Sequence, residues 1–238
     1  MKGWINGIGW VTPAGLGQGR QSQLQPLQPG ELPIPTRKDV FAQIDRRFGR
    51  LDDFSRVGLA AVCFCLRDAG AEDWQQKRPL GIIAASRYGC LQTDLAYLQT
   101  LLPQQGKLAS PNLFAYTLPN CFLGEAALRF GLTGNSLIIN RADPTRLAAL
   151  KMGIEELAFS EQCGMLVGIV DLPPPAELAA ADDLPGSLFL LLENSPRGTS
   201  GGYGELELCG DELSFNGELV VDLPQLLAAC LKLSAPAV

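Results

Sequence analysis

The stretch NSLIINRADPTRLAALKMGIEELAFS (residues 135–160) sets the fold of this chain. It begins with a short apolar run of strand length, crosses a polar corner and continues with apolar residues at helical spacing. Asp143 and Pro144 lie in the corner. Aspartate is a favoured N-cap residue and proline a favoured first helical residue, so we expect the helix to begin at this pair. The stretch is therefore predicted to be a strand that turns directly into a helix.

The same alternation of strand and helix continues on both sides of this stretch. The other predicted strands are residues 3–11, 79–86, 163–170, 187–194 and 202–210, and the other predicted helices are residues 52–70, 86–102, 118–131 and 222–233. Such alternation predicts an α/β fold, with one mixed sheet of roughly five strands and helices on both faces.

Two segments of the chain are predicted to be loops. Residues 17–36 are rich in Gln, Pro and Gly and are predicted to form an extended loop. Residues 171–186 are predicted to be an internal connector, because neither side of them has enough elements to cover a sheet. We therefore expect a single domain over residues 1–238.

Composition excludes several classes of function. Of the 238 residues 47% are hydrophobic and 18% are charged, which is typical of a chain that buries a core. The net charge of −6 and the lack of basic residues interleaved with aromatics argue against nucleic-acid binding. No apolar run reaches the roughly 18 to 20 residues of a membrane span, and the first residues lack a secretory signal pattern. We expect a cytoplasmic protein.

The use of histidine and cysteine limits the enzyme chemistry that is open to this chain. The chain has no histidine, so it has no imidazole base, imidazole metal ligand or Ser-His pair. Its seven cysteines are scattered and mostly lie in apolar segments, which predicts reduced core residues. The glycines of NGIGWVTPAG (6–15) depart from a dinucleotide-binding loop and are better explained by the TPAG turn. We expect neither a metal site nor a cofactor.

Several stretches, taken in order, resemble the β-ketoacyl synthases, the condensing enzymes of fatty acid and polyketide assembly that share the thiolase fold. Residues 6–15 are similar to the family's first strand and turn, residues 48–70 to a following helix, and residues 82–94 to a second strand and turn. SPNLFAYTLPNCFLGEAALRFGLTGNSL (110–137) and SLFLLLEN (187–194) follow the same pattern. The resemblance implies a thiolase-like half, because the second half of a synthase, with its two catalytic histidines, has no counterpart here.

The resemblance also assigns a place to Asp143. Carried without gaps from Gly134, the family's nucleophilic cysteine falls on Asp143, so the resemblance implies no catalytic residue at this position. Asp143 is interpreted as a helix cap, with a chemical role as the alternative. Cys121 falls near the family's subunit interface and is interpreted as a buried thiol rather than a nucleophile.

Chain length factors are family members that have lost the cysteine and pair with a ketosynthase. The resemblance implies that this chain is a non-catalytic partner of this kind for an active β-ketoacyl-[acyl carrier protein] synthase, in a heterodimer or with itself. Residues 135–140 are the predicted edge strand. Asn112, Leu113, Phe114 and Tyr116 lie in the segment that projects toward the partner's acyl tunnel in the family, and ordinary interior packing is the other interpretation.

Acyl carrier proteins are acidic, and so is this chain, so we expect a carrier protein to dock through the ketosynthase partner. Arg46, Arg47 and Arg50 form the candidate basic patch, with a solvated helix start as the alternative. Two other hypotheses remain open at this point: an acyl-thioester acyltransferase or hydrolase of unfamiliar mechanism, and a remnant with a structural role.

Overall fold

The centre of the computed structural model is a mixed sheet in the order β4-β3-β5-β6-β1-β7-β8-β9, with β2 paired to β1. The structure describes residues 1–19, 30–198 and 202–234. The strands are β1 (Lys2–Thr12), β2 (Gly15–Gln18), β3 (Leu80–Ser86), β4 (Ser136–Asn140), β5 (Gly164–Asp171), β6 (Gly186–Glu193), β7 (Gly204–Cys209), β8 (Glu212–Phe215) and β9 (Glu218–Leu219). β3 runs parallel to β4 and β5, and the other pairings among the described strands are antiparallel.

The predicted mixed α/β sheet is confirmed, with more strands than predicted. The five central strands β4-β3-β5-β6-β1 match the predicted size, and the described residues contain nine strands in all. β2, β8 and β9 are only two to four residues long. Strands of that length are too short for their pattern of apolar and polar residues to identify them in the sequence.

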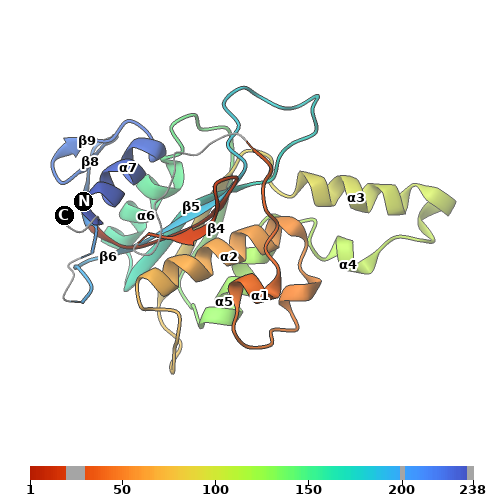
Figure 1. The fold of residues 1–238 in the computed structure, drawn as a ribbon, viewed down its shortest axis with the longest axis horizontal. Coiled ribbons are helices and arrows are strands. Elements are labelled where there is room, and N and C mark those ends of the chain that lie inside the picture. Colours follow the sequence, from red (N-terminus) through yellow and green to blue (C-terminus); the bar gives the residue numbers. More distant parts are fainter. Residues whose placement is uncertain (20–29, 199–201, 235–238) are drawn as a thin grey trace.

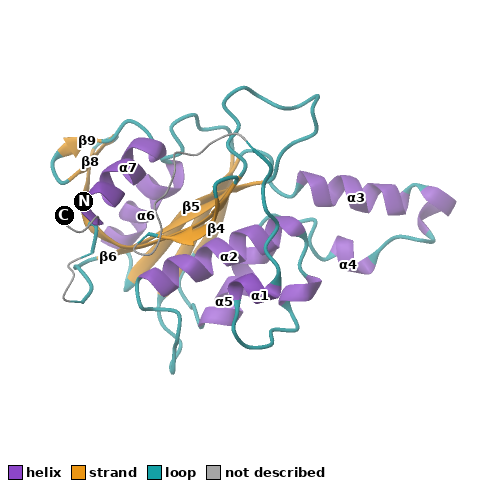
Figure 2. Cartoon of the chain, viewed as in Figure 1, coloured by secondary structure: helices purple, strands orange, loops and turns teal. Residues whose placement is uncertain are grey.

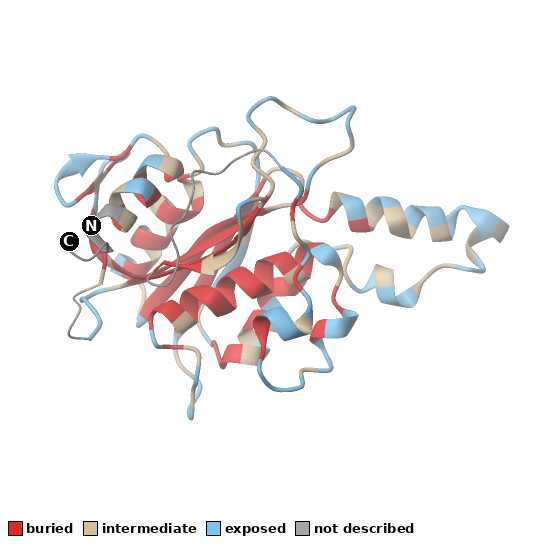
Figure 3. Cartoon of the chain, in the orientation of Figure 1, coloured by how far each residue is buried: buried red, intermediate tan, exposed pale blue. Residues whose placement is uncertain are grey.

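Helices cover both faces of the sheet (Figures 1 and 2). α2 (Asp53–Asp68) and α5 (Cys121–Phe130) lie on one face, and α6 (Ala148–Phe159) and α7 (Leu223–Ser234) lie on the other. The other helical segments are α1 (Arg37–Val40), α3 (Leu91–Leu101), α4 (Pro111–Phe114) and the 3₁₀ turns η1 (Phe48–Arg50) and η2 (Pro103–Gly106). Figure 3 shows that the buried residues gather in the sheet and in the helix faces that cover it.

α2 is the most deeply buried helix and confirms the helix predicted at 52–70. Its N-cap is Asp52, whose carboxylate accepts the N–H of Ser55 at 3.1 Å. Gly70 follows the helix with a φ of +64°, a conformation that glycine adopts without strain. Phe54 meets Phe122 of α5 edge to face, with ring centroids 5.7 Å apart.

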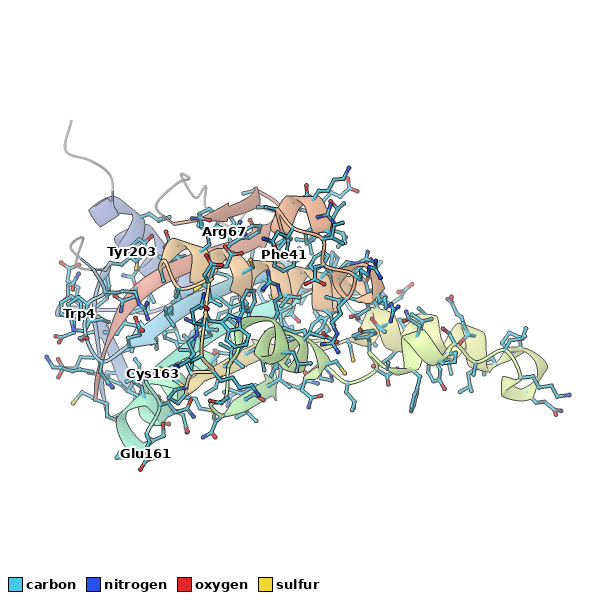
Figure 4. The ribbon with its side chains drawn as sticks, turned by 90° about the horizontal axis from the view of Figure 1, so that it is seen from below. Trp4, Phe41, Arg67, Glu161, Cys163 and Tyr203 are labelled. Carbon is cyan, nitrogen blue, oxygen red and sulfur yellow. The ribbon has the colours of Figure 1, made fainter. Side chains whose placement is uncertain are left out.

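The C-terminal strands and α7 complete the core on the α6 side. Leu206, Leu213 and Leu226 join the same hydrophobic cluster as Ile154 of α6. Tyr203 (Figure 4) donates its hydroxyl to buried Asp68 at 2.7 Å. Residues 203–230 are therefore part of the same packed unit as the central sheet.

The two predicted loops have different outcomes. The prediction of a loop over residues 17–36 is wrong at its start, because Gly17 and Gln18 belong to β2 and pair with β1. Residues 31–36 have no regular structure, and residues 20–29 lie outside the described residues. The connector predicted at 171–186 joins the antiparallel neighbours β5 and β6. Among the helices that the structure describes, none is long and apolar enough to cross a membrane.

Gly7 and Gly9 let α2 lie directly on β1. A Cβ atom at Gly9 would come within 2.1 Å of the Cys65 backbone nitrogen, and one at Gly7 within 2.4 Å of the Cys65 carbonyl oxygen. The explanation of these glycines by the TPAG turn is therefore wrong for both, because they lie inside β1 and serve helix packing. Of the glycines in this stretch, Gly15 follows the turn, with a φ of +117°.

We predict that Gly9→Ala destabilises the chain by about 3 kcal/mol or more, because neither the strand nor the helix backbone has room for a methyl group. The measurement is the free energy of unfolding in urea. Gly124→Ala is the matched control, because Gly124 is exposed in α5 and an added Cβ meets no atom within 4 Å. It should stabilise the chain by about 0.5–1 kcal/mol, and equal changes in the two variants would contradict the packing argument.

Candidate functional site

The strand-to-helix corner lies between Asn140, where β4 ends, and Ala148, where α6 begins. The Asp143 carboxylate accepts hydrogen bonds from the Thr145 N–H at 3.0 Å, the Thr145 hydroxyl at 2.8 Å and the Ala148 N–H at 2.9 Å. Burial by itself would raise the pKa of Asp143, but these hydrogen bonds outweigh it and hold that pKa below its usual value. Asp143 is therefore an ionised carboxylate bound into the corner.

The prediction that Asp143 is the N-cap and Pro144 the first helical residue is wrong. Leu147 occupies the N-cap position and makes no side-chain cap. Arg146 has a φ of +58°, in the left-handed region, which interrupts the helical path before α6 begins. The Asp143 carboxylate still accepts the N–H of Ala148, so it satisfies a free donor at the helix start from outside the cap position.

Asp143 lines two hollows of different size. The smaller, of about 40 Å³, lies between the corner and residues 182–185 of the β5–β6 connector. It has room for a few water molecules at most. The larger, of about 410 Å³, is an open depression along the β4 edge and α6, and its lining includes Ile139 and Met152. The larger one has the volume of a ligand or partner site.

Asp171, at the end of β5, holds the turn that follows β3. Its carboxylate accepts the Ser86 hydroxyl at 2.8 Å, the Arg87 N–H at 2.9 Å and the Tyr88 N–H at 3.0 Å. Burial raises the pKa of Asp171 although these hydrogen bonds act in the opposite direction. Sequence reasoning missed this residue. The sequence signal that could have identified Asp171 is its position as a lone carboxylate at the end of a buried strand.

α3, η2 and α4 form an arm, residues 91–118, that extends away from the sheet (Figures 1 and 4). The Tyr97 and Phe114 rings of α3 and α4 lie 5.6 Å apart and join the two helices. The arm exposes many large apolar side chains. They are Leu95, Leu98, Leu101, Leu102, Leu108, Phe114 and Leu118.

The four predicted tunnel or interface residues lie on this arm. Asn112 and Phe114 are exposed, Phe114 by 63%, whereas Leu113 and Tyr116 are partly buried. Tyr116 packs against the hydrophobic cluster of α2 and α5. The interpretation that these residues pack in the interior is therefore wrong for Asn112 and Phe114, and it holds in part for Tyr116. None of the four is among the residues that line the hollows at Asp143.

The cysteines are less uniformly buried than predicted. The buried ones are Cys63, Cys65, Cys90 and Cys230, whereas Cys121 is partly buried and Cys163 and Cys209 are exposed. The Cys121 thiol donates to the Ala115 carbonyl at 3.1 Å, and burial raises its pKa. A thiol with a raised pKa is a poor nucleophile.

Two further sequence predictions can be located in the structure. β4, predicted as the edge strand, is the outermost strand on its side of the sheet and exposes Leu137 by 45%. Arg46, Arg47 and Arg50 are exposed in the segment before α2. Arg47 lies 3.5 Å from the Glu125 carboxylate, so the basic patch is partly neutralised.

Solved structures share this fold at low sequence identity. The ishigamide ketosynthase/chain length factor matches with a TM-score of 0.66 and 17% identity, over 87% of this chain and 66% of that one. A type II PKS acyl-carrier protein in complex with its ketosynthase bound to the hexaketide matches with a TM-score of 0.68 and 18% identity, over 86% and 67%. This chain therefore spans about two thirds of the length of those two chains.

A ketosynthase in complex with its chain length factor, from Xenorhabdus doucetiae, matches over nearly the whole of both chains. The TM-score is 0.60 and the identity 18%, over 99% of this chain and 92% of that one. Among curated proteins, none matches this chain. Residues 34–183 match the family model described as the β-ketoacyl synthase N-terminal domain. Because this match covers more than half of its length, the chain belongs to the β-ketoacyl synthase family through the amino-terminal domain of that family.

Proposed function

We propose that this chain is a non-catalytic, chain-length-factor-like partner of an active β-ketoacyl-[acyl carrier protein] synthase in fatty-acid or polyketide-type biosynthesis. The observation that carries the proposal is Asp143. Carried without gaps from Gly134, the resemblance to the family implies that this residue takes the place of the family's nucleophilic cysteine. In the structure its carboxylate accepts three hydrogen bonds that stabilise the corner.

The chemistry of the corner argues against a condensation step on this chain. An oxyanion that forms about 4 Å from an ionised carboxylate is destabilised by several kcal/mol at an intermediate dielectric constant. The chain has no histidine to bind a thioester carbonyl. Its candidate thiol, Cys121, has a raised pKa and donates to a backbone carbonyl. These features favour a role in which the partner performs the reaction.

The exposed surfaces support a partner. Monomers seldom leave large contiguous apolar patches exposed, and the arm carries seven exposed leucine and phenylalanine side chains. β4 is a sheet edge, and such edges are commonly covered or paired. The matched chain from the ketosynthase and chain length factor complex has nearly the same length as this one. The proposed assembly is a heterodimer with a ketosynthase, with a homodimer when the chain is alone.

Within this assembly the arm has the proposed task of limiting acyl-chain depth. Asn112, Leu113, Phe114 and Tyr116 are the proposed tunnel or interface residues, and exposed Phe114 has the bulk to block a partner's tunnel. An acidic acyl carrier protein is proposed to dock on the ketosynthase, because this chain has a net charge of −6. The proposed site of action is the cytoplasm.

The proposed role of the arm in binding is tested by measuring the affinity of this chain for a type II ketosynthase encoded in the same genome. We predict that Phe114→Asp weakens binding about 30-fold, which corresponds to roughly 2 kcal/mol, because buried aromatic anchors dominate interfaces. Ile44→Asp is the control, because Ile44 is 81% exposed and lies outside the arm. It should change the dissociation constant less than about twofold. Failure of the native chain to bind, or equal losses in both variants, would contradict the proposal.

Covalent chemistry is tested by incubating the purified chain with acyl carrier protein thioesters and recording intact masses. We expect no added acyl group on this chain alone. In the complex, we expect the acyl group on the ketosynthase subunit. An acyl adduct on the isolated chain would favour the acyltransferase or hydrolase hypothesis, and peptide mapping would then locate it.

Asp143 is tested by a pair of substitutions. Asp143→Ala should lower the free energy of unfolding by about 1 kcal/mol, because the N–H groups of Thr145 and Ala148 lose their acceptor. Asp143→Asn keeps an acceptor oxygen, so its free energy of unfolding should fall by less. Both variants should leave the condensation rate of the complex within about twofold of the native rate. A tenfold drop without loss of stability would show that the carboxylate takes part in the reaction.

A further inference from the structure

The β5–β6 connector, residues 172–185, is attached to the rest of the molecule mainly through polar contacts. We call it the strap. The Arg87 guanidinium lies 2.8 Å from the Asp182 carboxylate and 3.0 Å from the Asp183 carboxylate. The Tyr88 hydroxyl donates to the Leu178 carbonyl at 2.9 Å and also bonds Asp183. Both anchoring side chains belong to the turn that Asp171 holds.

Two further contacts attach the strap at its ends. Arg146, in the corner that carries Asp143, donates to the Asp182 carbonyl. Gln92, in the first turn of α3, donates to the Pro173 carbonyl. The strap is therefore bonded both to the root of the arm and to the corner.

The strap buries little of its own surface. Leu172 is its one buried residue, with 5% exposed, and the remaining residues are partly or fully exposed. Within the strap, the Leu178 N–H donates to the Pro175 carbonyl and the Asp183 N–H to the Ala180 carbonyl. A segment with few apolar contacts and a small set of exposed ion pairs opens locally far more readily than a buried sheet.

Residues at both ends of the strap close the small hollow beside Asp143. Leu172 and Pro174 line it from one end, and residues 182–185 from the other. Ala85 and Ile169 also line the hollow, and both are almost fully buried. An opened strap would therefore expose an apolar floor next to Arg141, Arg146 and Asp143 of the corner.

We propose that the strap is a latched cover over the corner, held shut by Arg87 and Tyr88, and that it opens as a unit when these contacts break. Arg87 faces Asp182 and Asp183, and the same hollow contains Arg141, Arg146, Asp143 and Asp171. Because exposed ion pairs weaken as salt screens them, opening should increase with ionic strength. The proposal concerns this chain alone and stands independently of the proposed partner.

The test is hydrogen exchange of the full chain, with peptides that cover the strap and the sheet read separately. In Arg87→Gln, the amides of residues 178–183 should exchange at least tenfold faster, with β5 and β6 unchanged. Arg56→Gln is the matched control, because it removes an exposed ion pair with Asp53 on α2. It should leave strap exchange within about twofold of the native rate.

Cleavage by a glutamate-specific protease gives a second readout. Glu177 is the single glutamate of the strap and is exposed. Cleavage after Glu177 should be at least tenfold faster in Arg87→Gln. Added 0.5 M salt should accelerate cleavage in the native chain and in Arg56→Gln, and should have little further effect in Arg87→Gln.

Access to the floor is tested with Ala85→Cys, because Ala85 lines the hollow and is almost fully buried, followed by maleimide labelling and peptide mapping. Labelling at position 85 should be at least fivefold faster when Arg87→Gln is added. Unchanged labelling would show that the strap moves without uncovering the corner, and would overturn the proposal. Strap exchange in Arg87→Gln within twofold of native, or equal acceleration in Arg56→Gln, would overturn it as well. If Arg87→Gln loses protection from exchange throughout the sheet, Tyr88→Phe becomes the deciding variant. The proposal then requires Tyr88→Phe to accelerate hydrogen exchange in the strap and nowhere else.

Discussion

The arrangement of the site depends on one partly buried carboxylate. Asp171 ends β5 and accepts hydrogen bonds from three consecutive residues, Ser86 to Tyr88, that leave β3. Because the two strands are parallel neighbours, their ends meet at the same edge of the sheet, and a single side chain can span the gap. Burial acts against its charge, and donors from the turn offset part of that penalty. The fixed turn then supplies both the root of the arm and the side chains that hold the strap.

At the adjacent corner, the first N–H group of α6 is already occupied by a side chain of the same chain. A helix N-terminus offers free N–H groups that can stabilise a thiolate or a developing oxyanion. Here the Thr145 and Ala148 N–H groups both donate to the Asp143 carboxylate. A substrate oxygen would have to displace an anion that is held in place by its own chain. The same local geometry that assists catalysis elsewhere in the family therefore serves stability in the proposed role.

The longer regular elements were predictable from the sequence, because apolar spacing and the residues that begin and end helices indicate them. The central strands and α2 follow from such patterns, whereas the edge position of β4 was expected from the family resemblance. The start of α6 was not predictable from such patterns, because it depends on the left-handed backbone conformation of Arg146. The guanidinium of Arg146 donates a hydrogen bond to the strap, which lies further along the chain. The role of Gly7 and Gly9 was missed for the same reason, since only the helix that lies across β1 requires them. The contacts of Asp171, and those of Arg87 and Tyr88 with the strap, likewise depend on pairs more than eighty residues apart.

The distribution of apolar surface indicates which parts of the molecule would be covered in the proposed complex. β7 and β8 extend the sheet and α7 packs on its α6 side, so that Leu206, Leu213 and Leu226 are buried there. The arm receives no such cover, and its leucines and Phe114 remain exposed although its two helices pack against each other. A chain that encloses one face with its own C-terminal segment has the means to cover apolar surface internally. The uncovered arm is therefore consistent with the proposed contact to another subunit.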